Sequence, residues 1–159
     1  MERSVIFQNF VDKWTHPEYR PTPVAQEQLD KCARELEVEF PASYIEYATV
    51  YGSGGPTMEL LNSIVDGELE VNDLSDMHTP DEIIDSIESW KSAGMPNDLV
   101  PIASDSMGNM FCFKHSEIME PNDDAGIWFF DHDFDTVEKT HDSFTAWINE
   151  LVQIENLDA

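Results

Sequence analysis

Four consecutive large apolar residues, Ile-Trp-Phe-Phe at 127–130, constrain the fold of this chain more than any other segment. Successive side chains of a β-strand point to opposite faces of its sheet, so a strand without a polar position is buried on both faces. We therefore predict a strand over 127–133, IWFFDHD, in the interior of a sheet that is covered on both sides.

Other segments supply neighbours for that strand. Residues 99–103 (LVPIA) and 110–115 (MFCFKH) have strand character, and SDSMGN between them has the residues that a tight reversal needs. Upstream, MELLNSIV and ELEVNDL over 58–74 resemble two strands around Asp66–Gly67, a strong hairpin-turn signal. We expect a mainly antiparallel sheet of about five to six strands.

Helical periodicity dominates the first half of the chain and returns at its end. Helices are expected over 5–14, over 24–37, from Pro41 to the glycines at 52–55, from Thr79 to Ala93, and over 143–151. Thr79, Pro80 and Glu82 form a capping-box signature at the start of the fourth helix. Ser143, or one of the two residues before it, is the candidate cap of the last helix.

These elements predict one α+β domain, with helices first, an antiparallel sheet afterwards and a closing helix. We divide the chain into an N-terminal helix and proline-rich connector over 1–23, the domain over 24–155, and a tail over 156–159. The connector breaks the first helix, because its three prolines cannot continue it. The region of Trp14 and Tyr19 is either an additional cover on the core or an element specific to a partner.

Charge is the most unusual feature of the composition. The chain has 33 Asp and Glu against 8 Lys and Arg, a formal net charge of −25, with no Lys or Arg between Arg34 and Lys91. Contacts to phosphates require Lys and Arg, so nucleic acid and anionic membrane surfaces are excluded as partners. Two explanations of the acidic surplus stay open, solubility and a cationic partner.

Neither a membrane segment nor a cysteine-based site is predicted. No segment approaches the roughly 20 apolar residues that span a bilayer, and the N-terminal sequence lacks the pattern of a secretory signal. A cytoplasmic location is therefore expected. Cys32 and Cys112 lie far apart without a CxxC pair, so each is expected to be a small buried apolar residue, and no cofactor is predicted.

The candidates for catalysis are weak. The tripeptide at 141–143, His-Asp-Ser, has the residue types of a catalytic triad, but triads are assembled from residues distant in the chain. Asp131, Asp133 and Asp135 would share a face on an extended strand and could bind Ca²⁺ or Mg²⁺. The glycine and glutamate of an EF-hand do not follow them, so we expect a solvated acidic strand end. No catalytic or metal-binding residue is assigned, and the chain is not expected to be an enzyme.

Four motifs occur in a characteristic order. LEVEFPASYIEYATVYGSGG contains a helix end, a proline, a tyrosine-containing helix and a glycine-rich turn. LVPIASDSMGNMFCFK contains a strand, an Asp-x-x-Gly-Asn turn and a second strand; IWFFDHD is the next strand and SFTAWINEL the closing helix. Together, over about residues 24–151, these motifs resemble the SMI1/KNR4 (SUKH) family of α+β domains.

The resemblance implies a function in binding. Members of this family are common in bacteria as immunity proteins, so we expect a non-enzymatic protein that binds and neutralises a cognate toxin. Such toxins are often nucleases with a basic substrate groove, which an acidic chain could cover by imitating phosphate. SMI1/KNR4-like chains also occur as adaptors that assemble signalling proteins. That alternative stays open, as does a weaker one, a hydrolase that uses a metal at DHDFD.

Two acidic groups are assigned to the partner-binding surface. The first consists of Asp66, Glu68, Glu70 and Asp73, and the second consists of Asp131, Asp133 and Asp135. The expected partner is a basic toxin protein. Neither nucleic acid nor a membrane is expected to bind, and the sequence does not indicate an oligomeric state.

Overall fold

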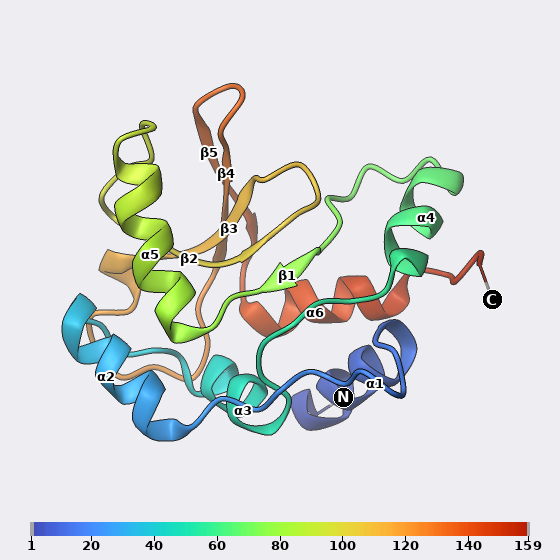
Figure 1. Ribbon diagram of the computed structural model, residues 1–159, viewed down its shortest axis with the longest axis horizontal. Helices are drawn as coiled ribbons and strands as arrows, with labels where there is room; N and C mark the ends of the chain where they lie inside the picture. The colour runs from blue at the N-terminus through green and yellow to red at the C-terminus, as the bar shows by residue number, and fades with distance from the viewer. Residues whose placement is uncertain (1, 159) are drawn as a thin grey trace.

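The computed structural model describes residues 2–158, which form six α-helices, a short 3-10 helix and one five-stranded sheet (Figure 1). The α-helices are α1 (Arg3–Trp14), α2 (Gln26–Leu36), α3 (Ala42–Val50), α4 (Met58–Asp66), α5 (Pro80–Lys91) and α6 (Phe144–Gln153). The strands are β1 (Asp76–Met77), β2 (Leu99–Ser104), β3 (Met110–Lys114), β4 (Ile127–Asp131) and β5 (Thr136–His141), and the 3-10 helix η1 (His115–Glu117) follows β3. The predicted α+β class is confirmed. None of the helices within residues 2–158 is long and apolar enough to cross a membrane.

The sheet is an antiparallel meander whose strand order follows the chain from β1 to β5. Each strand pairs with the next in antiparallel register, and in the centre Phe111 of β3 lies opposite Phe129 of β4. The strands predicted over 99–103, 110–115 and 127–133 correspond to β2, β3 and β4. The two edge strands, β1 and β5, lie in segments that had no predicted strand.

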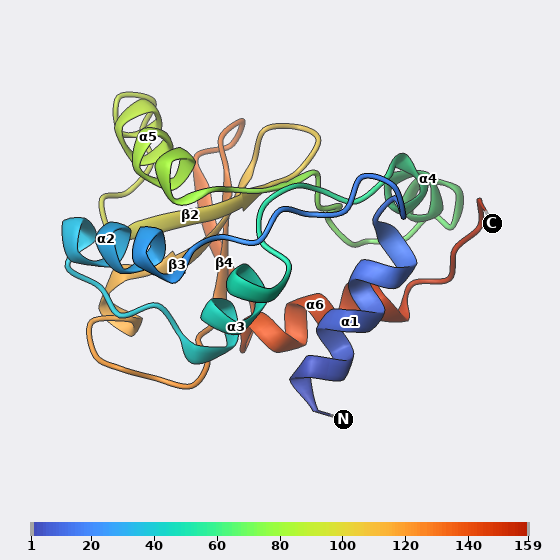
Figure 2. The same ribbon diagram turned by 60° about the horizontal axis from the view of Figure 1, so that its bottom comes forward.

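The sheet buries side chains on both faces. Along β4, Ile127 and Phe129 belong to the main hydrophobic core, Phe130 belongs to a smaller cluster, and Trp128 packs against that cluster. Helices α1, α3 and α6 lie on the side of the main core, and α5 covers the other cluster through Trp90 (Figure 1, Figure 2). The predicted burial of this apolar run on both faces is confirmed.

The N-terminal helix α1 packs along the closing helix α6 (Figure 2). Phe7, Phe10 and Trp14 are buried, and Trp14 Nε1 donates a 2.8 Å hydrogen bond to the carbonyl oxygen of Leu151. By contrast, Tyr19 in the connector is 77% exposed. The burial of Trp14 makes α1 a cover on the core, whereas a partner-specific role of the connector at Tyr19 stays a prediction.

The predicted strand pair over 58–74 is wrong. The first half of this segment forms α4, and the second half is irregular up to β1. Leu60, Ser63 and Ile64 are buried at the i, i+3 and i+4 spacing of a helix face, a spacing that the sequence MELLNSIV satisfies as well as it satisfies strand alternation. Gly67 therefore ends a helix instead of turning a hairpin.

The caps predicted for two helices are present. Thr79 Oγ1 accepts a hydrogen bond from the backbone N–H of Glu82 at 3.1 Å, and Glu82 Oε1 accepts one from the backbone N–H of Thr79 at 2.8 Å. Ser143 Oγ accepts a hydrogen bond from the backbone N–H of Ala146 at 3.0 Å. Since each cap satisfies a backbone donor that the first turn leaves free, the caps fix where α5 and α6 begin.

Candidate functional site

The β4–β5 hairpin projects beyond the body of the sheet, and its tip is the sequence DHDFD at 131–135 (Figure 1). Phe134 is 77% exposed at this hairpin tip, and its neighbours Asp133 and Asp135 are exposed as well. An exposed aromatic ring between two carboxylates combines apolar contact area with negative charge. This combination is suited to binding a protein with an apolar recess and basic surroundings.

The hairpin tip is a turn, so the predicted common strand face for Asp131, Asp133 and Asp135 is wrong. Asp131 Oδ1 accepts hydrogen bonds from the backbone N–H groups of Asp133 (2.9 Å) and Phe134 (3.3 Å), which closes an Asx turn. Asp135 then has a φ of 52°, in the left-handed region. Within residues 2–158, no three His, Cys, Asp or Glu side chains are placed to hold a metal ion.

The base of the hairpin tip is held by the β2–β3 turn and by α5. Asn109 Oδ1 accepts a hydrogen bond from the backbone N–H of His132 at 3.2 Å and lies 2.7 Å from His132 Nδ1. On the other side, the ring centroids of His132 and Trp90 are 5.2 Å apart. Phe134 is therefore presented by a backbone that is anchored just before it.

Asp105 in turn holds Asn109 in place. Its Oδ1 accepts hydrogen bonds from the backbone N–H groups of Met107 (2.9 Å) and Asn109 (2.8 Å), and its Oδ2 accepts one from Asn109 Nδ2 (3.2 Å). Gly108 has a φ of 84°, a conformation that favours glycine. The Asp-x-x-Gly-Asn motif is thus a supporting turn, and no local pattern in the sequence indicates that it orients the hairpin tip.

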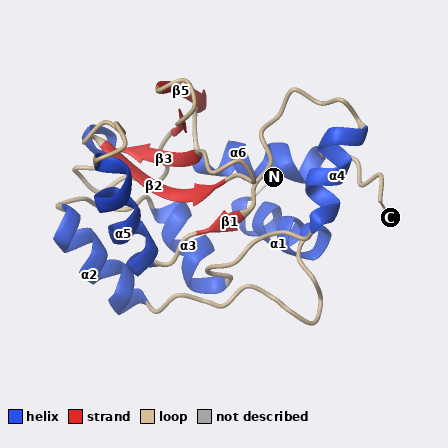
Figure 3. Cartoon of the chain, turned by 45° about the horizontal axis from the view of Figure 1, so that its top comes forward, coloured by secondary structure: helices blue, strands red, loops and turns tan. Residues whose placement is uncertain are grey.

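The other predicted acidic group does not form one surface. Asp66, Glu68 and Glu70 are exposed at and after the end of α4, which lies at one end of the molecule, away from the hairpin tip (Figure 3). Asp73 is only 8% exposed and accepts hydrogen bonds from the backbone N–H (3.2 Å) and hydroxyl (3.1 Å) of Ser106. Burial raises the pKa of the Asp73 carboxyl, although the bonds from Ser106 oppose this. A role for these four residues in binding stays a prediction.

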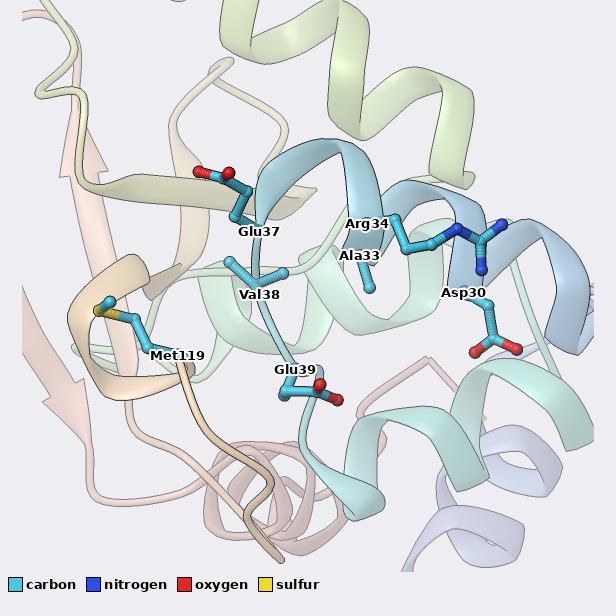
Figure 4. A pocket seen from close by; sticks show the side chains of 7 residues that line it. All are labelled: Asp30, Ala33, Arg34, Glu37, Val38, Glu39 and Met119. Carbon is cyan, nitrogen blue, oxygen red and sulfur yellow. The ribbon is translucent and has the colours of Figure 1, made fainter.

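A surface hollow of about 460 Å³ lies between the end of α2 and the loop that carries Met119 (Figure 4). Its charged lining comes from Asp30, Arg34, Glu37 and Glu39. The charged ends of Arg34, Glu37 and Glu39 point in different directions in Figure 4. A small-molecule site needs polar groups that converge on the ligand, so this hollow is a weaker candidate than the hairpin tip.

The potential nucleophiles and bases have structural roles. Ser143 caps α6, and His141 Nε2 lies 3.0 Å from Glu150 Oε1. Cys32 and Cys112 are free and buried, as predicted. Burial raises the pKa of the Cys32 thiol to about 12 and also raises the pKa of Cys112. Because the thiolate is the nucleophilic form, neither cysteine is activated at neutral pH.

Comparison with known proteins places the chain in a family. The sequence profile of the SMI1/KNR4 family (SUKH-1) matches residues 23–150, from the end of the proline-rich connector into α6. Helix α1 precedes the matched range. No curated protein matches the chain as a relative. Because the match covers well over half of the chain, the protein belongs to the SMI1/KNR4 family (SUKH-1).

Proposed function

We propose that this chain is a cytoplasmic, non-enzymatic immunity protein that binds a cognate toxin and neutralises it by covering a basic substrate groove. Membership in the SMI1/KNR4 family supports the proposal, because immunity proteins are common in that family. The basic character of the toxin follows from the charge of the chain. A chain with 33 acidic and 8 basic side chains attracts cationic partners and repels acidic ones.

The observation that carries the proposal is the geometry of the hairpin tip. Phe134 is 77% exposed, and the turn that presents it is fixed by Asp131. Aromatic side chains that become buried on binding are among the residues that contribute most to protein–protein affinity. In the proposed complex the ring enters an apolar recess of the toxin, and the carboxylates of Asp133 and Asp135 meet Lys or Arg at its edge.

Charge and the aromatic ring act on different steps of binding. Complementary charge raises the association rate, toward about 10⁸–10⁹ M⁻¹s⁻¹ at low salt. Burial of Phe134 would lower the dissociation rate, which is where most affinity differences between related complexes arise. An inhibitor needs fast association and slow dissociation, since it must meet the toxin before the toxin reaches its substrate and must then stay bound.

Asp66, Glu68 and Glu70 supply the second part of the proposed contact. Their exposure on α4 and the segment after it lets them attract the basic toxin from the other end of the molecule. Asp73 is buried, so in this proposal it acts indirectly, by holding Ser106 in the β2–β3 turn.

The experiment that tests the proposal is purification of the tagged chain from its native cells at low salt, followed by mass spectrometry. We expect one stoichiometric basic partner, encoded by an adjacent gene, whose enzymatic activity is lost when one equivalent of the chain is added. A set of substoichiometric acidic or neutral regulatory proteins would contradict the proposal and favour the adaptor function.

A further inference from the structure

A second candidate surface lies between α4, the end of α6 and the tail that follows it; α4 and the end of α6 lie close together at one end of the molecule (Figure 1, Figure 2). The surface is a groove of about 430 Å³, which we call the α4–α6 groove, and its apolar lining comes from Gly67, Leu69, Val71, Ile154 and Leu157. The groove lies outside the hairpin tip and contains none of its residues.

Gly67 lines the α4–α6 groove beside Leu69 and Leu157. A Cβ atom at this position would lie 2.9 Å from the carbonyl oxygen of Ser63, 3.4 Å from Leu69 Cγ and 3.6 Å from Leu157 Cδ1, so a larger residue would press on the backbone of α4 and on both leucines. Leu69 is 42% exposed and Leu157 is 45% exposed. Contiguous exposed apolar side chains rimmed by polar residues are a feature of interaction sites, since their burial by a partner is favourable.

The walls of the groove are joined by hydrogen bonds between α4 and the C-terminal tail. Ser63 Oγ accepts a hydrogen bond from the backbone N–H of Leu157 at 2.9 Å. Glu59 Oε2 accepts one from Asn156 Nδ2, also at 2.9 Å. The tail is thus docked against α4, and a partner would meet a groove that is already formed, which lowers the entropic cost of binding.

Within residues 2–158, the lining of the groove includes the carboxylates of Glu150 and Glu155 and no Lys or Arg, although the imidazole of His141 lies 3.0 Å from Glu150 Oε1. The two segments that form the groove, residues 58–71 and 144–158, contain no Lys or Arg. Their acidic residues are Glu59, Asp66, Glu68, Glu70, Glu150, Glu155 and Asp158. One lysine reaches this end of α6 from α1, but the Lys13 ammonium donates a 2.8 Å hydrogen bond to the carbonyl oxygen of Val152 and lies over the Trp14 ring.

We infer that the α4–α6 groove binds a basic segment of a protein partner that packs one or two aliphatic side chains against Leu69 and Leu157. The apolar lining requires an aliphatic side chain, and the acidic rim requires Lys or Arg beside it. This inference rests on the proposed function, because the segment would belong to the same basic toxin that meets the hairpin tip. A toxin held at both ends of the molecule would dissociate more slowly than one held at either end.

The test is a nuclear magnetic resonance titration of the isotope-labelled full chain with a short synthetic peptide of lysine and leucine. The matched control peptide has the same lysines, with serine in place of each leucine. We expect the leucine peptide to shift the amide signals of Gly67, Leu69 and Leu157 and to bind at least about tenfold more tightly than the serine peptide, because only it buries apolar surface.

A pair of variants locates the site. Leu69→Ser combined with Leu157→Ser should weaken binding of the leucine peptide about tenfold. Met107→Ser combined with Met119→Ser removes two exposed apolar side chains elsewhere, 68% and 60% exposed, and should leave the affinity for the leucine peptide unchanged. Leu157→Ala alone, with an intermediate effect expected, serves if the double variant does not fold.

Three results would overturn the inference: equal affinity for both peptides, signal shifts centred on the hairpin tip, or unchanged affinity in the leucine variants. These results bear on the groove alone, because the titration does not use the toxin. If the purification from native cells returned a stoichiometric basic partner and the titration failed, the proposed function would stand without the groove. If no such partner were found, the proposed function would fail whatever the peptide did.

Discussion

The hairpin tip and the α4–α6 groove are both acidic and both expose apolar side chains, but their shapes are opposite. At the tip, the single ring of Phe134 stands out from a turn that is hydrogen-bonded internally. In the groove, Leu69 and Leu157 flank a hollow of about 430 Å³. The tip therefore suits a recess on a partner, and the groove suits a protruding side chain. Net charge alone does not distinguish these two modes of recognition.

The two regions also differ in what holds them in shape. The tip depends on the two backbone N–H groups that donate to Asp131 from two and three positions ahead, together with the contacts of His132 to Asn109 and Trp90. The groove depends on a hydrogen bond between Ser63 and Leu157, which are 94 residues apart. The tip should therefore resist disturbance elsewhere in the chain, whereas the groove exists only while α4 and the tail after α6 are both docked.

The largest expected effect is a loss of stability when a buried residue of α1 is removed, which should disturb the groove more than the tip. Trp14 is fully buried against α6, where its Nε1 donates to the carbonyl oxygen of Leu151. Trp14→Ala leaves a cavity behind the helix that forms one wall of the groove, so the free energy of unfolding should fall by about 3–5 kcal/mol. Chemical denaturation measures this. Tyr19→Ala is the control, with a change within about 0.5 kcal/mol because Tyr19 is exposed.

Hydrogen exchange in the same variant sharpens the comparison. The amides of residues 154–157 should exchange faster in Trp14→Ala than in the wild type, and those of residues 132–134 should change less. Equal acceleration at both regions would show that the hairpin tip depends on α1 as much as the groove does.

The next effect concerns binding alone. Phe134→Ser should weaken the affinity for the basic partner by about 2 kcal/mol, roughly thirtyfold, because the ring is the apolar anchor of the tip. The free energy of unfolding should stay the same, since the side chain is 77% exposed. Calorimetric titration measures the affinity, with Met107→Ser as the control for an exposed apolar residue on the adjacent turn. An unchanged affinity in Phe134→Ser would remove the tip from the interface.

The elements with strong local signals could be predicted from the sequence. The apolar runs that form β2, β3 and β4 and the capping box of Thr79 and Glu82 depend on residues close together in the chain, so pattern and spacing were sufficient. α4 was mistaken for strands because its apolar residues satisfy both periodicities, and only packing decides between them. β5 was missed because TVEKTH is largely polar and exposed, and its strand conformation comes from pairing with β4.

The candidate site was only partly predictable. The acidic residues of the tip and of the segment after α4 stand out in the sequence. How far each one is buried cannot be read from it. Asp73 is buried beside Ser106 through contacts 33 residues apart, and no local pattern indicates this. Phe134 comes shortly after the apolar run at 127–130, and its exposure depends on the Asx turn at Asp131. The groove could not be predicted, because it forms only when the tail docks on α4, and these two segments are far apart in the sequence.

A smaller effect tests whether association with the partner depends on where the acidic residues lie or only on the net charge. Glu68→Lys combined with Glu70→Lys places positive charge at the rim of the α4–α6 groove and should slow association with the basic partner about tenfold at low salt. Asp85→Lys combined with Glu88→Lys changes the net charge equally on the exposed side of α5 and is the control. Stopped-flow kinetics would measure the association rate of both double variants. Equal slowing would mean that net charge steers association, and no slowing would remove Glu68 and Glu70 from the proposed surface.

The smallest effect concerns Asp73, which links the segment after α4 to the turn that supports the hairpin tip. Burial raises the pKa of its carboxyl above the ordinary value of 3.8, and nearby Asp105 raises it further, while Ser106 opposes the shift. The folded state therefore holds this proton more tightly than the unfolded state. The contribution of Asp73 to the free energy of unfolding must then fall as the pH rises above 3.8 toward neutrality.

Asp73→Asn keeps an oxygen that accepts from Ser106 but cannot ionise, so its free energy of unfolding should decline less steeply with pH than that of the wild type. Urea denaturation across this pH range measures the slope, and Asp85→Asn controls for the loss of one exposed negative charge. If Asp73→Asn kept the slope of the wild type, the bonds from Ser106 would balance the burial of the carboxylate. If instead it shifted the amide signals of His132 and Phe134, the support of the tip would extend through Ser106 to the segment after α4, and the two regions would be coupled.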